Sequence, residues 1–259
     1  MSTGISKATN ERRGNYFKKV ITILKADLIE YTRVKIAIVV SMLQPVVMMI
    51  AFGLVSLHGG QENFIHSAPG ILGVAVMFSV TFSAGFTTIS DRERRLIDDV
   101  VLSPVSYSAF ILSRLFSAMI KCILPTAAAL LIGMIFFDLE IVHVSSIIFS
   151  YIISVVIYAG LGMMVGAFTN HLAFEGMVNF FLIPAMFFGG VFFPVDQLGP
   201  LSNVVRYFAI TPSIELFRYG LSGQIEIGSL LSSYIILLIY AVVSFLMGVF
   251  SFKAAVTKR

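Results

Sequence analysis

Ser90 to Pro104 reads SDRERRLIDDVVLSP, and this charged stretch lies between two segments apolar enough to dissolve in lipid. Seven of the nine residues from Asp91 to Asp99 are charged, whereas only 12% of the 259-residue chain is charged. On both sides, uncharged runs of about twenty residues recur, the length needed to cross a hydrocarbon core of roughly 30 Å. The stretch therefore connects two predicted membrane spans, and it carries far more charge than a simple turn needs.

The composition indicates an integral membrane protein. Hydrophobic residues make up 58% of the chain, whereas soluble domains are nearer half apolar and about a quarter charged. The apolar runs lack the alternation of a transmembrane barrel, so helices are expected. The predicted fold class is all-α integral membrane. It has six transmembrane helices, an N-terminal amphipathic interfacial helix and short outer re-entrant helices before the sixth span.

The chain is expected to divide into two parts. Residues 1–35 form a cytoplasmic tail with the interfacial helix, and residues 36–259 form the six-span transmembrane domain. The spans are predicted at about residues 36–57, 69–89, 107–137, 144–169, 176–193 and 228–252. The segments between them include the charged loop (90–104), a polar turn (Asn170 to Glu175) and an outer re-entrant segment (194–227).

Lys and Arg set the predicted orientation. They gather in the N-terminal region, in the charged loop and at the C-terminus, while the loops after the first and third spans have neither. By the positive-inside rule, both termini are expected in the cytoplasm, with the chain in a bacterial-type inner or plasma membrane.

The N-terminal helix is predicted from apolar residues at helical spacing, with basic residues between them. Such a helix can lie in the headgroup layer with its apolar face toward the membrane. The alternative is a basic topogenic tail with no defined pose. The apolar face comprises Phe17, Val20, Ile21, Leu24, Leu28 and Tyr31. The residues assigned to the interfacial helix are Phe17, Lys18, Lys19, Leu24, Leu28 and Arg33.

No catalytic constellation is visible, so the chain is not expected to be an enzyme. His58, His66, His143 and His171 lie in or beside predicted loops, without spacing suited to a metal, and no P-loop pattern occurs. The single cysteine, Cys122, excludes an intramolecular disulfide and a cysteine-based metal cluster. No metal or cofactor is expected in this chain, and its net charge of +4 gathers near membrane boundaries rather than marking a nucleic-acid site.

Charges within the predicted spans are almost restricted to Arg114, Lys121 and Glu175. The long stems of Arg114 and Lys121 are expected to reach the inner interface. A carrier driven by protons or sodium is disfavoured because no carboxylate lies at mid-membrane, and no charged ring or carbonyl filter indicates a channel. The energy for any transport must come from a partner.

The outer segment is predicted to contain two short helices. Gly199-Pro200 opens the first, whose apolar face comprises Leu201, Val204, Val205 and Phe208. Thr211-Pro212 has the pattern of an N-cap followed by proline, and Glu215 can pair with Arg218 at i+3. The segment is either a plug that shapes the outer rim or a gate for cargo. The outer-gate residues are Phe193, Pro194, Leu198, Pro200, Pro212, Glu215 and Arg218.

The order of these features resembles the membrane subunit of ATP-binding-cassette exporters of the second export type. That group includes permeases for polysaccharides, glycolipids, drugs and other amphiphiles. The residues that carry the resemblance are Leu102-Ser103-Pro104-Val105 and the run from Phe193-Pro194 through Leu198, Pro200 and Pro212 to Arg218. The resemblance implies a half-transporter that works with a second copy of itself or a close relative, and with membrane lipid. Two cassette ATPase subunits would bind ATP and Mg.

The resemblance also implies that the charged loop forms a coupling helix seated in a cleft of the ATPase. On a helix, its charges can pair at i,i+3 and i,i+4 and still leave some for a partner, with Leu96, Val100 and Val101 as apolar contacts. The alternative is a solvated, self-paired loop that sets topology. The predicted ATPase-docking residues are Asp91, Arg92, Glu93, Arg94, Arg95, Leu96, Asp98, Asp99 and Leu102.

The predicted function is that of the permease subunit of an ATP-driven exporter. Its substrate would be lipid-like, a glycolipid or a hydrophobic drug-type molecule. The alternatives are a polysaccharide exporter permease and a non-transporting membrane scaffold or assembly factor. Side chains of the fifth span could line the pathway, although helix packing explains them equally well. These are Phe180, Phe181, Met186, Phe187 and Phe188.

Overall fold

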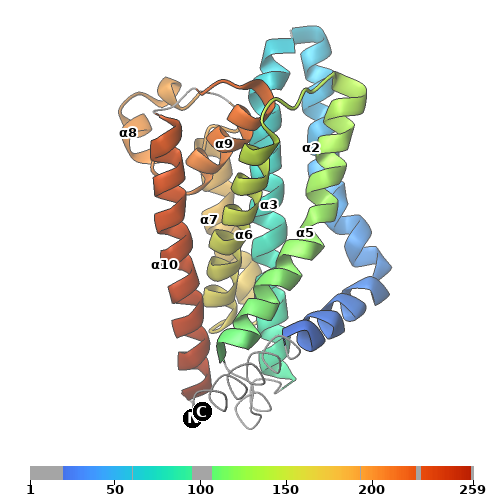
Figure 1. The fold of residues 1–259 in the computed structure, drawn as a ribbon, viewed down its shortest axis with the longest axis vertical. Coiled ribbons are helices and arrows are strands. Elements are labelled where there is room, and N and C mark those ends of the chain that lie inside the picture. Colours follow the sequence, from blue (N-terminus) through green and yellow to red (C-terminus); the bar gives the residue numbers. More distant parts are fainter. Residues whose placement is uncertain (1–19, 60, 95–106, 193, 226–228, 258–259) are drawn as a thin grey trace, which may run out of the picture.

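The computed structural model describes residues 20–59, 61–94, 107–192, 194–225 and 229–257, and every regular element in these ranges is a helix. A helix over residues 20–33, here called the N-terminal helix, comes first. The later elements are α2 (Lys35–Gly59), α3 (Gln61–Glu93), α5 (Tyr107–Phe137), α6 (Val144–Gly166), α7 (His171–Phe188), η1 (Val195–Leu201), α8 (Ser202–Val205), α9 (Ile210–Ser222) and α10 (Leu230–Thr257). Figure 1 shows the long helices side by side in one bundle, with the N-terminal helix lying obliquely across one end.

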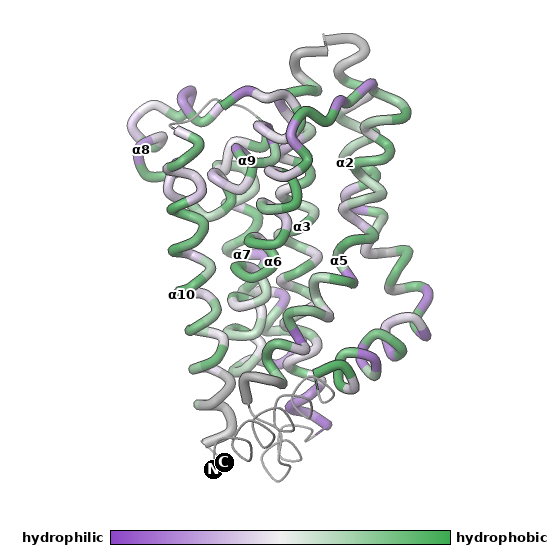
Figure 2. The backbone as a smooth tube through the Cα atoms, in the orientation of Figure 1, coloured by the Kyte–Doolittle hydropathy of each residue, from purple (hydrophilic) through white to green (hydrophobic). Residues whose placement is uncertain are grey.

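Within the described part of the chain, five helices are long and apolar enough to cross a membrane. These stretches are Phe64–Glu93, Phe110–Phe137, Val144–Gly166, His171–Phe188 and Leu230–Ser251. In Figure 2 the hydrophobic colour runs along the bundle, whereas hydrophilic residues gather toward its two ends. The prediction of an all-α membrane protein is confirmed. Helix α2 contributes a shorter apolar stretch, Ser41–Val55, so the sixth crossing stays a prediction.

Helix α6 packs against α3 on one side and α10 on the other. The small residues that permit a close approach are Gly160, Gly162 and Gly166, here called the glycine seam. A methyl group on Gly162 would lie 2.4 Å from the carbonyl oxygen of Thr81 in α3, and one on Gly160 would lie 2.4 Å from that of Ser244 in α10. Membrane helices associate through small residues in this way because apolar side chains gain little by leaving lipid.

The helix bounds correct several predictions. Helix α5 has the bounds predicted for the third span, residues 107–137. Helix α3 is longer than the predicted span at both ends and includes Ser90–Glu93, so the charged loop does not begin at residue 90. The charges of Asp91 and Arg92 do not end the helix, because both side chains have partners within the protein.

The polar turn predicted at Asn170 to Glu175 is wrong, because α7 begins at His171. The side-chain oxygen of Asn170 accepts a hydrogen bond of 2.9 Å from the backbone N–H of Ala173, which makes Asn170 the N-cap. The helix ends at Phe188, just before Gly190 at φ +83°. The fifth long helix therefore lies five residues earlier than the predicted span, 176–193.

Helix α9 packs against α3, α6 and α10, so it is an internal element of the bundle rather than a surface helix. It begins at Ile210, and the prediction of Thr211 as N-cap is wrong. The Thr211 hydroxyl instead donates to the carbonyl oxygen of Val205 at 2.9 Å. The predicted apolar face before it is not buried as a unit: Val205 is buried, whereas Leu201, Val204 and Phe208 are exposed.

Candidate functional site

The N-terminal helix crosses the end of α3 and the beginning of α5 at one end of the bundle, here called the charged end (Figure 1). Asp27 is buried there, on the side of the N-terminal helix that faces the bundle. Its Oδ2 atom lies 2.7 Å from Nζ of Lys121, and its Oδ1 atom lies 3.1 Å from Nη1 of Arg114. The Ser117 hydroxyl also donates to Asp27. Arg114 and Lys121 are seven residues apart and share one side of α5, so a single carboxylate can reach both.

Asp91 extends this arrangement to the end of α3, because its Oδ1 atom pairs with Arg114. Asp27, Asp91, Arg114 and Lys121 therefore form a group of two acids and two bases, here called the ion cluster. None of these side chains is more than 10% exposed. Charged side chains as buried as these require partners of opposite charge, because each loses its hydration. Among the described residues, no three His, Cys, Asp or Glu side chains are placed to hold a metal ion.

Asp27 is ionised in this cluster. Burial acts to raise the pKa of its carboxyl, but the charges of Lys121 and Arg114 act in the opposite direction. Hydrogen bonds from Lys121 and Ser117 add to them, and together they hold the pKa of Asp27 below its usual value. The ion cluster therefore contains charged pairs at neutral pH.

Arg114 and Lys121 both reach Asp27, which lies on the helix predicted to occupy the inner interface. The position of the membrane interface stays a prediction. Asp27 itself was missed by the sequence reasoning. Its signal was present, because position 27 falls on the apolar face of the N-terminal helix, next to Leu28 and between Leu24 and Tyr31. An acid on such a face is costly unless it is paired.

The end of α3 has two further attachments. The guanidinium of Arg92 donates to the carbonyl oxygens of Ala167, at 2.8 Å, and Thr169, which lie in the turn between α6 and α7. Arg94 forms a salt bridge of 2.6 Å with Glu30 of the N-terminal helix, and both side chains are more than half exposed. The end of α3 is thus bound to α5, to the α6–α7 turn and to the N-terminal helix.

These contacts divide the predicted docking residues. Asp91 is buried and Arg92 is half-buried, and both side chains bond within the protein, where they hold α3 in place. Their role in docking stays a prediction. Glu93 and Arg94 are exposed and stay in the docking prediction. The docking residues that lie outside the described part of the chain are Arg95, Leu96, Asp98, Asp99 and Leu102.

The residues assigned to the interfacial helix differ in their exposure. Leu24 and Leu28 are half-buried, and Arg33 is exposed. Phe17, Lys18 and Lys19 lie outside the described residues. The helix therefore faces the bundle with a mixed surface, apolar at Leu24 and Leu28 and charged at Asp27.

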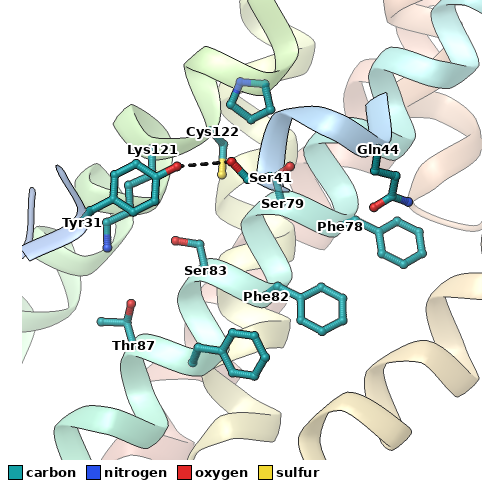
Figure 3. Close-up of a pocket in the computed structure, with 12 residues that line it drawn as sticks. Tyr31, Ser41, Gln44, Phe78, Ser79, Phe82, Ser83, Thr87, Lys121 and Cys122 are labelled. Carbon is teal, nitrogen blue, oxygen red and sulfur yellow. Dashed lines mark hydrogen bonds between the residues drawn. The ribbon is translucent and has the colours of Figure 1, made fainter. Parts of the chain in front are cut away.

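A pocket of about 440 Å³ opens beside the ion cluster, between the N-terminal helix, α2, α3 and α5 (Figure 3). One stripe of its lining is hydroxylated and comprises Ser79, Ser83 and Thr87 of α3. A neighbouring stripe of α3 is aromatic and comprises Phe78, Phe82 and Phe86. The other helices contribute Tyr31, Ser41, Gln44, Lys121, Cys122 and Pro125. The pocket is therefore amphipathic, and the sequence reasoning did not predict it.

At the opposite end of the bundle, Glu215 and Arg218 form the predicted i,i+3 salt bridge, with both side chains 3% exposed. Arg218 also donates to the carbonyl oxygens of His66 in α3, at 3.3 Å, and of Gly190 after α7, at 3.4 Å. The predicted pair is confirmed, and it joins three elements within the bundle.

The other outer-gate residues vary in burial. Pro194 and Leu198 are half-buried, Pro200 is exposed and Pro212 is buried. Phe193 lies outside the described residues. A gating role for these residues stays a prediction.

The phenylalanines proposed to line a pathway lie on the surface of α7. The exposed fractions of Phe180, Phe181, Phe187 and Phe188 lie between 41% and 72%, and Met186 is half-buried. A cargo pathway along this surface stays a prediction.

The long apolar helices, with hydrophilic residues gathered toward the two ends of the bundle, define a multi-pass membrane protein. Residues 18–222 match the family model described as ABC-2 type transporter. Because the match covers more than half of the chain, the chain belongs to the ABC-2 type transporter family, as the resemblance predicted. It is therefore a permease component of an ATP-binding-cassette transporter. No curated protein matches the chain.

Proposed function

We propose that this chain is the permease subunit of an ATP-driven exporter that moves a lipid-like, glycolipid or hydrophobic drug-type substrate out of the cytoplasm or inner leaflet. Two separate cassette ATPase subunits supply the energy, and a second copy or a close relative completes the pathway. Both chain ends lie on the cytoplasmic side of an inner or plasma membrane. The observation that supports this proposal is the triple attachment of the end of α3 at the charged end.

In this proposal the contacts at the charged end transmit force from the ATPase to the helices. The proposed coupling helix, expected over Asp91 to Leu102, begins at the end of α3, and its residues beyond Arg94 lie outside the described part of the chain. A displacement of that helix acts on the end of α3, and through Asp91 on Arg114 and the rest of the ion cluster. Removing one partner from a buried ion pair costs about 3–5 kcal/mol, because a charge is left uncompensated. The three attached elements therefore move together more readily than they separate.

Helix α2 is the sixth crossing in this proposal. Its 25 residues extend about 37 Å at 1.5 Å per residue, more than a hydrocarbon core of about 30 Å. Helix α9 re-enters the membrane from the opposite side, which is consistent with its burial among α3, α6 and α10. The proposed arrangement has six spans with both ends on one side.

The test is a charge reversal at Arg94 in the complex with the cassette ATPase, reconstituted in vesicles. We expect Arg94→Glu to abolish cargo-coupled transport and to lower ATPase activity. The melting temperature should change little, because an exposed salt bridge contributes only about 0–1 kcal/mol. Arg206→Glu is the matched control, since Arg206 lies at the opposite end, beside Asp196, and both activities should persist.

Two outcomes would contradict the proposal. Unchanged coupled activity in Arg94→Glu would remove the charged end as the place where force enters. Failure of any cassette ATPase to copurify with the chain in mild detergent would favour a scaffold or assembly factor. The charge swap Glu30→Arg/Arg94→Glu distinguishes the loss of the internal salt bridge from the loss of the contact with the ATPase. It restores the internal pair and leaves the reversed charge facing the ATPase.

A further inference from the structure

We infer that the pocket beside the ion cluster binds the neutral, hydroxyl-bearing head group of a membrane amphiphile, whose acyl chain lies along the phenylalanine stripe of α3. This inference rests on the proposed function, because it names the class of cargo that the permease holds. Four features of the pocket support it: its hydroxyl groups, its backbone carbonyls, its charge balance and its aromatic stripe.

The hydroxyl groups of α3 behave differently on its two sides. Thr81 and Thr88, on the buried side, each donate to the backbone carbonyl one turn earlier, at 2.6 and 2.8 Å. Ser79, Ser83 and Thr87 line the pocket (Figure 3), and they make no hydrogen bond to any residue that the structure describes. Helical Ser and Thr commonly bond back to that carbonyl, and a hydroxyl left unbonded in apolar surroundings is costly. These three hydroxyls are therefore available to bond a molecule in the pocket.

Two prolines each remove the helical hydrogen bond to the backbone carbonyl of a residue that lines the pocket. Pro45 in α2 and Pro125 in α5 have no N–H to donate to the carbonyl four residues earlier. Those carbonyls belong to Ser41 and Lys121, and both residues line the pocket. The side-chain amide of Gln44 adds two donors and an acceptor. This mixture suits a ligand with several hydroxyl groups, because each hydroxyl both donates and accepts.

The charge balance decides between classes of head group. Of the described residues that line the pocket, only Lys121 carries a charge, and Asp27 neutralises it at 2.7 Å. The whole ion cluster has two acids and two bases, so it has no net charge to offer. An anionic head group would be repelled by Asp27, and no unpaired cation of the cluster would compensate. A cationic head group would be repelled by Lys121. A neutral head meets neither penalty, because it brings no charge to desolvate.

The aromatic stripe supplies the apolar half of the site. The ring centroids of Phe78 and Phe82 are 6.2 Å apart, and those of Phe82 and Phe86 are 5.5 Å apart. Each phenylalanine directly precedes one of the pocket hydroxyls in sequence, so the two stripes run side by side along α3. An amphiphile can therefore place its polar head on one stripe and its chain on the other.

The experiment uses the absence of tryptophan from the chain. Phe82→Trp places a single fluorescent reporter in the pocket, and Phe116→Trp places one at an exposed position of α5 as the matched control. Each full-length variant is reconstituted in phosphatidylcholine vesicles with rising fractions of a lipid whose brominated acyl chains quench tryptophan. The three probes share these chains and differ only in the head: a glucosyl diacylglycerol, a phosphatidylglycerol and a phosphatidylcholine.

We expect the glucosyl lipid to quench Phe82→Trp at a several-fold lower mole fraction than either phospholipid. At Phe116→Trp all three should quench alike. In the Phe82→Trp background, Ser83→Ala or Thr87→Val should raise the half-quenching fraction of the glucosyl lipid about fivefold for each lost hydrogen bond. Thr81→Val is the control, because that hydroxyl bonds its own helix, and it should leave the preference unchanged.

Equal quenching of Phe82→Trp by the three lipids, or a preference for phosphatidylglycerol, would overturn the inference. If Phe82→Trp does not fold, Phe86→Trp reports from the same stripe. No step of this experiment involves an ATPase. A loss of lipid preference alongside coupled activity that responds to Arg94→Glu would therefore remove the inference and leave the proposed function standing.

Discussion

Removal of the Lys121 side chain should destabilise the protein, because Lys121 is a buried partner of Asp27. Lys121→Met leaves the carboxylate of Asp27 buried with only Arg114 as its ionic partner, and we expect a loss of about 3–5 kcal/mol in the free energy of unfolding. Asp27→Asn should act similarly, because it leaves the ammonium of Lys121 buried. The double variant Asp27→Asn/Lys121→Met should recover part of the loss, because it removes both charges. Thermal unfolding in detergent measures all three.

The control for this prediction is Lys25→Met on the same helix. Lys25 is exposed, so its replacement should stay within about 0.5 kcal/mol of the parent protein. Equal melting temperatures for Lys121→Met and Lys25→Met would show that the buried ion pair does not contribute to stability.

Single residues were predictable where their partner is near in the chain. Glu215 and Arg218 are three residues apart on one helix, so spacing alone predicted their pair. Asp27 and Lys121 lie on different helices, and their pairing depends on how the N-terminal helix settles on α5. No local rule gives that register, so Lys121 was expected at the membrane interface and Asp27 was not considered.

Among the elements, the glycine seam gives the clearest prediction. A methyl group added at Gly162 would lie 2.4 Å from a backbone oxygen of α3, so the helices must separate. We expect Gly162→Ala to cost about 1–3 kcal/mol through overpacking. Gly176→Ala in α7 is the matched control, because its new methyl group has no neighbour within 4 Å among the described residues. That variant should gain up to about 1 kcal/mol from helix propensity.

Thermal unfolding of the two variants in the same detergent checks this prediction. Shifts of the same sign and size would mean that α6 does not approach α3 as closely as the seam indicates.

The elements themselves were predictable where apolar runs have sharp ends. The bounds of α5 follow from its sequence because Asp138 comes directly after the run. The end of α3 was misplaced because charged residues normally lie outside a span, and here Asp91 and Arg92 find internal partners. The beginning of α7 was misplaced because an asparagine was assigned to a turn, although it caps a helix.

At the scale of the whole molecule, the number of crossings decides the topology. If α2, α3 and α5 each cross the membrane, residues 30 and 140 lie on opposite sides. If α2 does not cross, they lie on the same side. Glu30 and Glu140 are both exposed, so Glu30→Cys and Glu140→Cys in a Cys122→Ala background give single thiols to label.

We expect an impermeant maleimide to label Glu140→Cys in intact cells and Glu30→Cys only in inverted vesicles. Labelling of both thiols from one side would show that α2 does not cross. The Cys122→Ala parent is the blank, and Cys122 itself is buried.

The class of the molecule was predictable from composition and from the order of its segments, and the family match agrees with it. The pocket was not predictable, because it depends on four segments that meet only in the fold. Ser79, Ser83 and Thr87 fall within the second predicted span, 69–89, and the structure places them at the wall of a cavity.

Helix α3 has a mechanical consequence for the molecule. It runs without a break for 33 residues, about 50 Å, and it contains both Asp91 of the ion cluster and His66, whose carbonyl accepts from Arg218. The glycine seam stiffens it against α6, because backbone atoms in contact leave no side chains to give way. In the proposed function, helix α3 therefore transmits an axial displacement from the ion cluster toward Arg218. The helices that do not pack at the glycine seam must therefore move relative to α3.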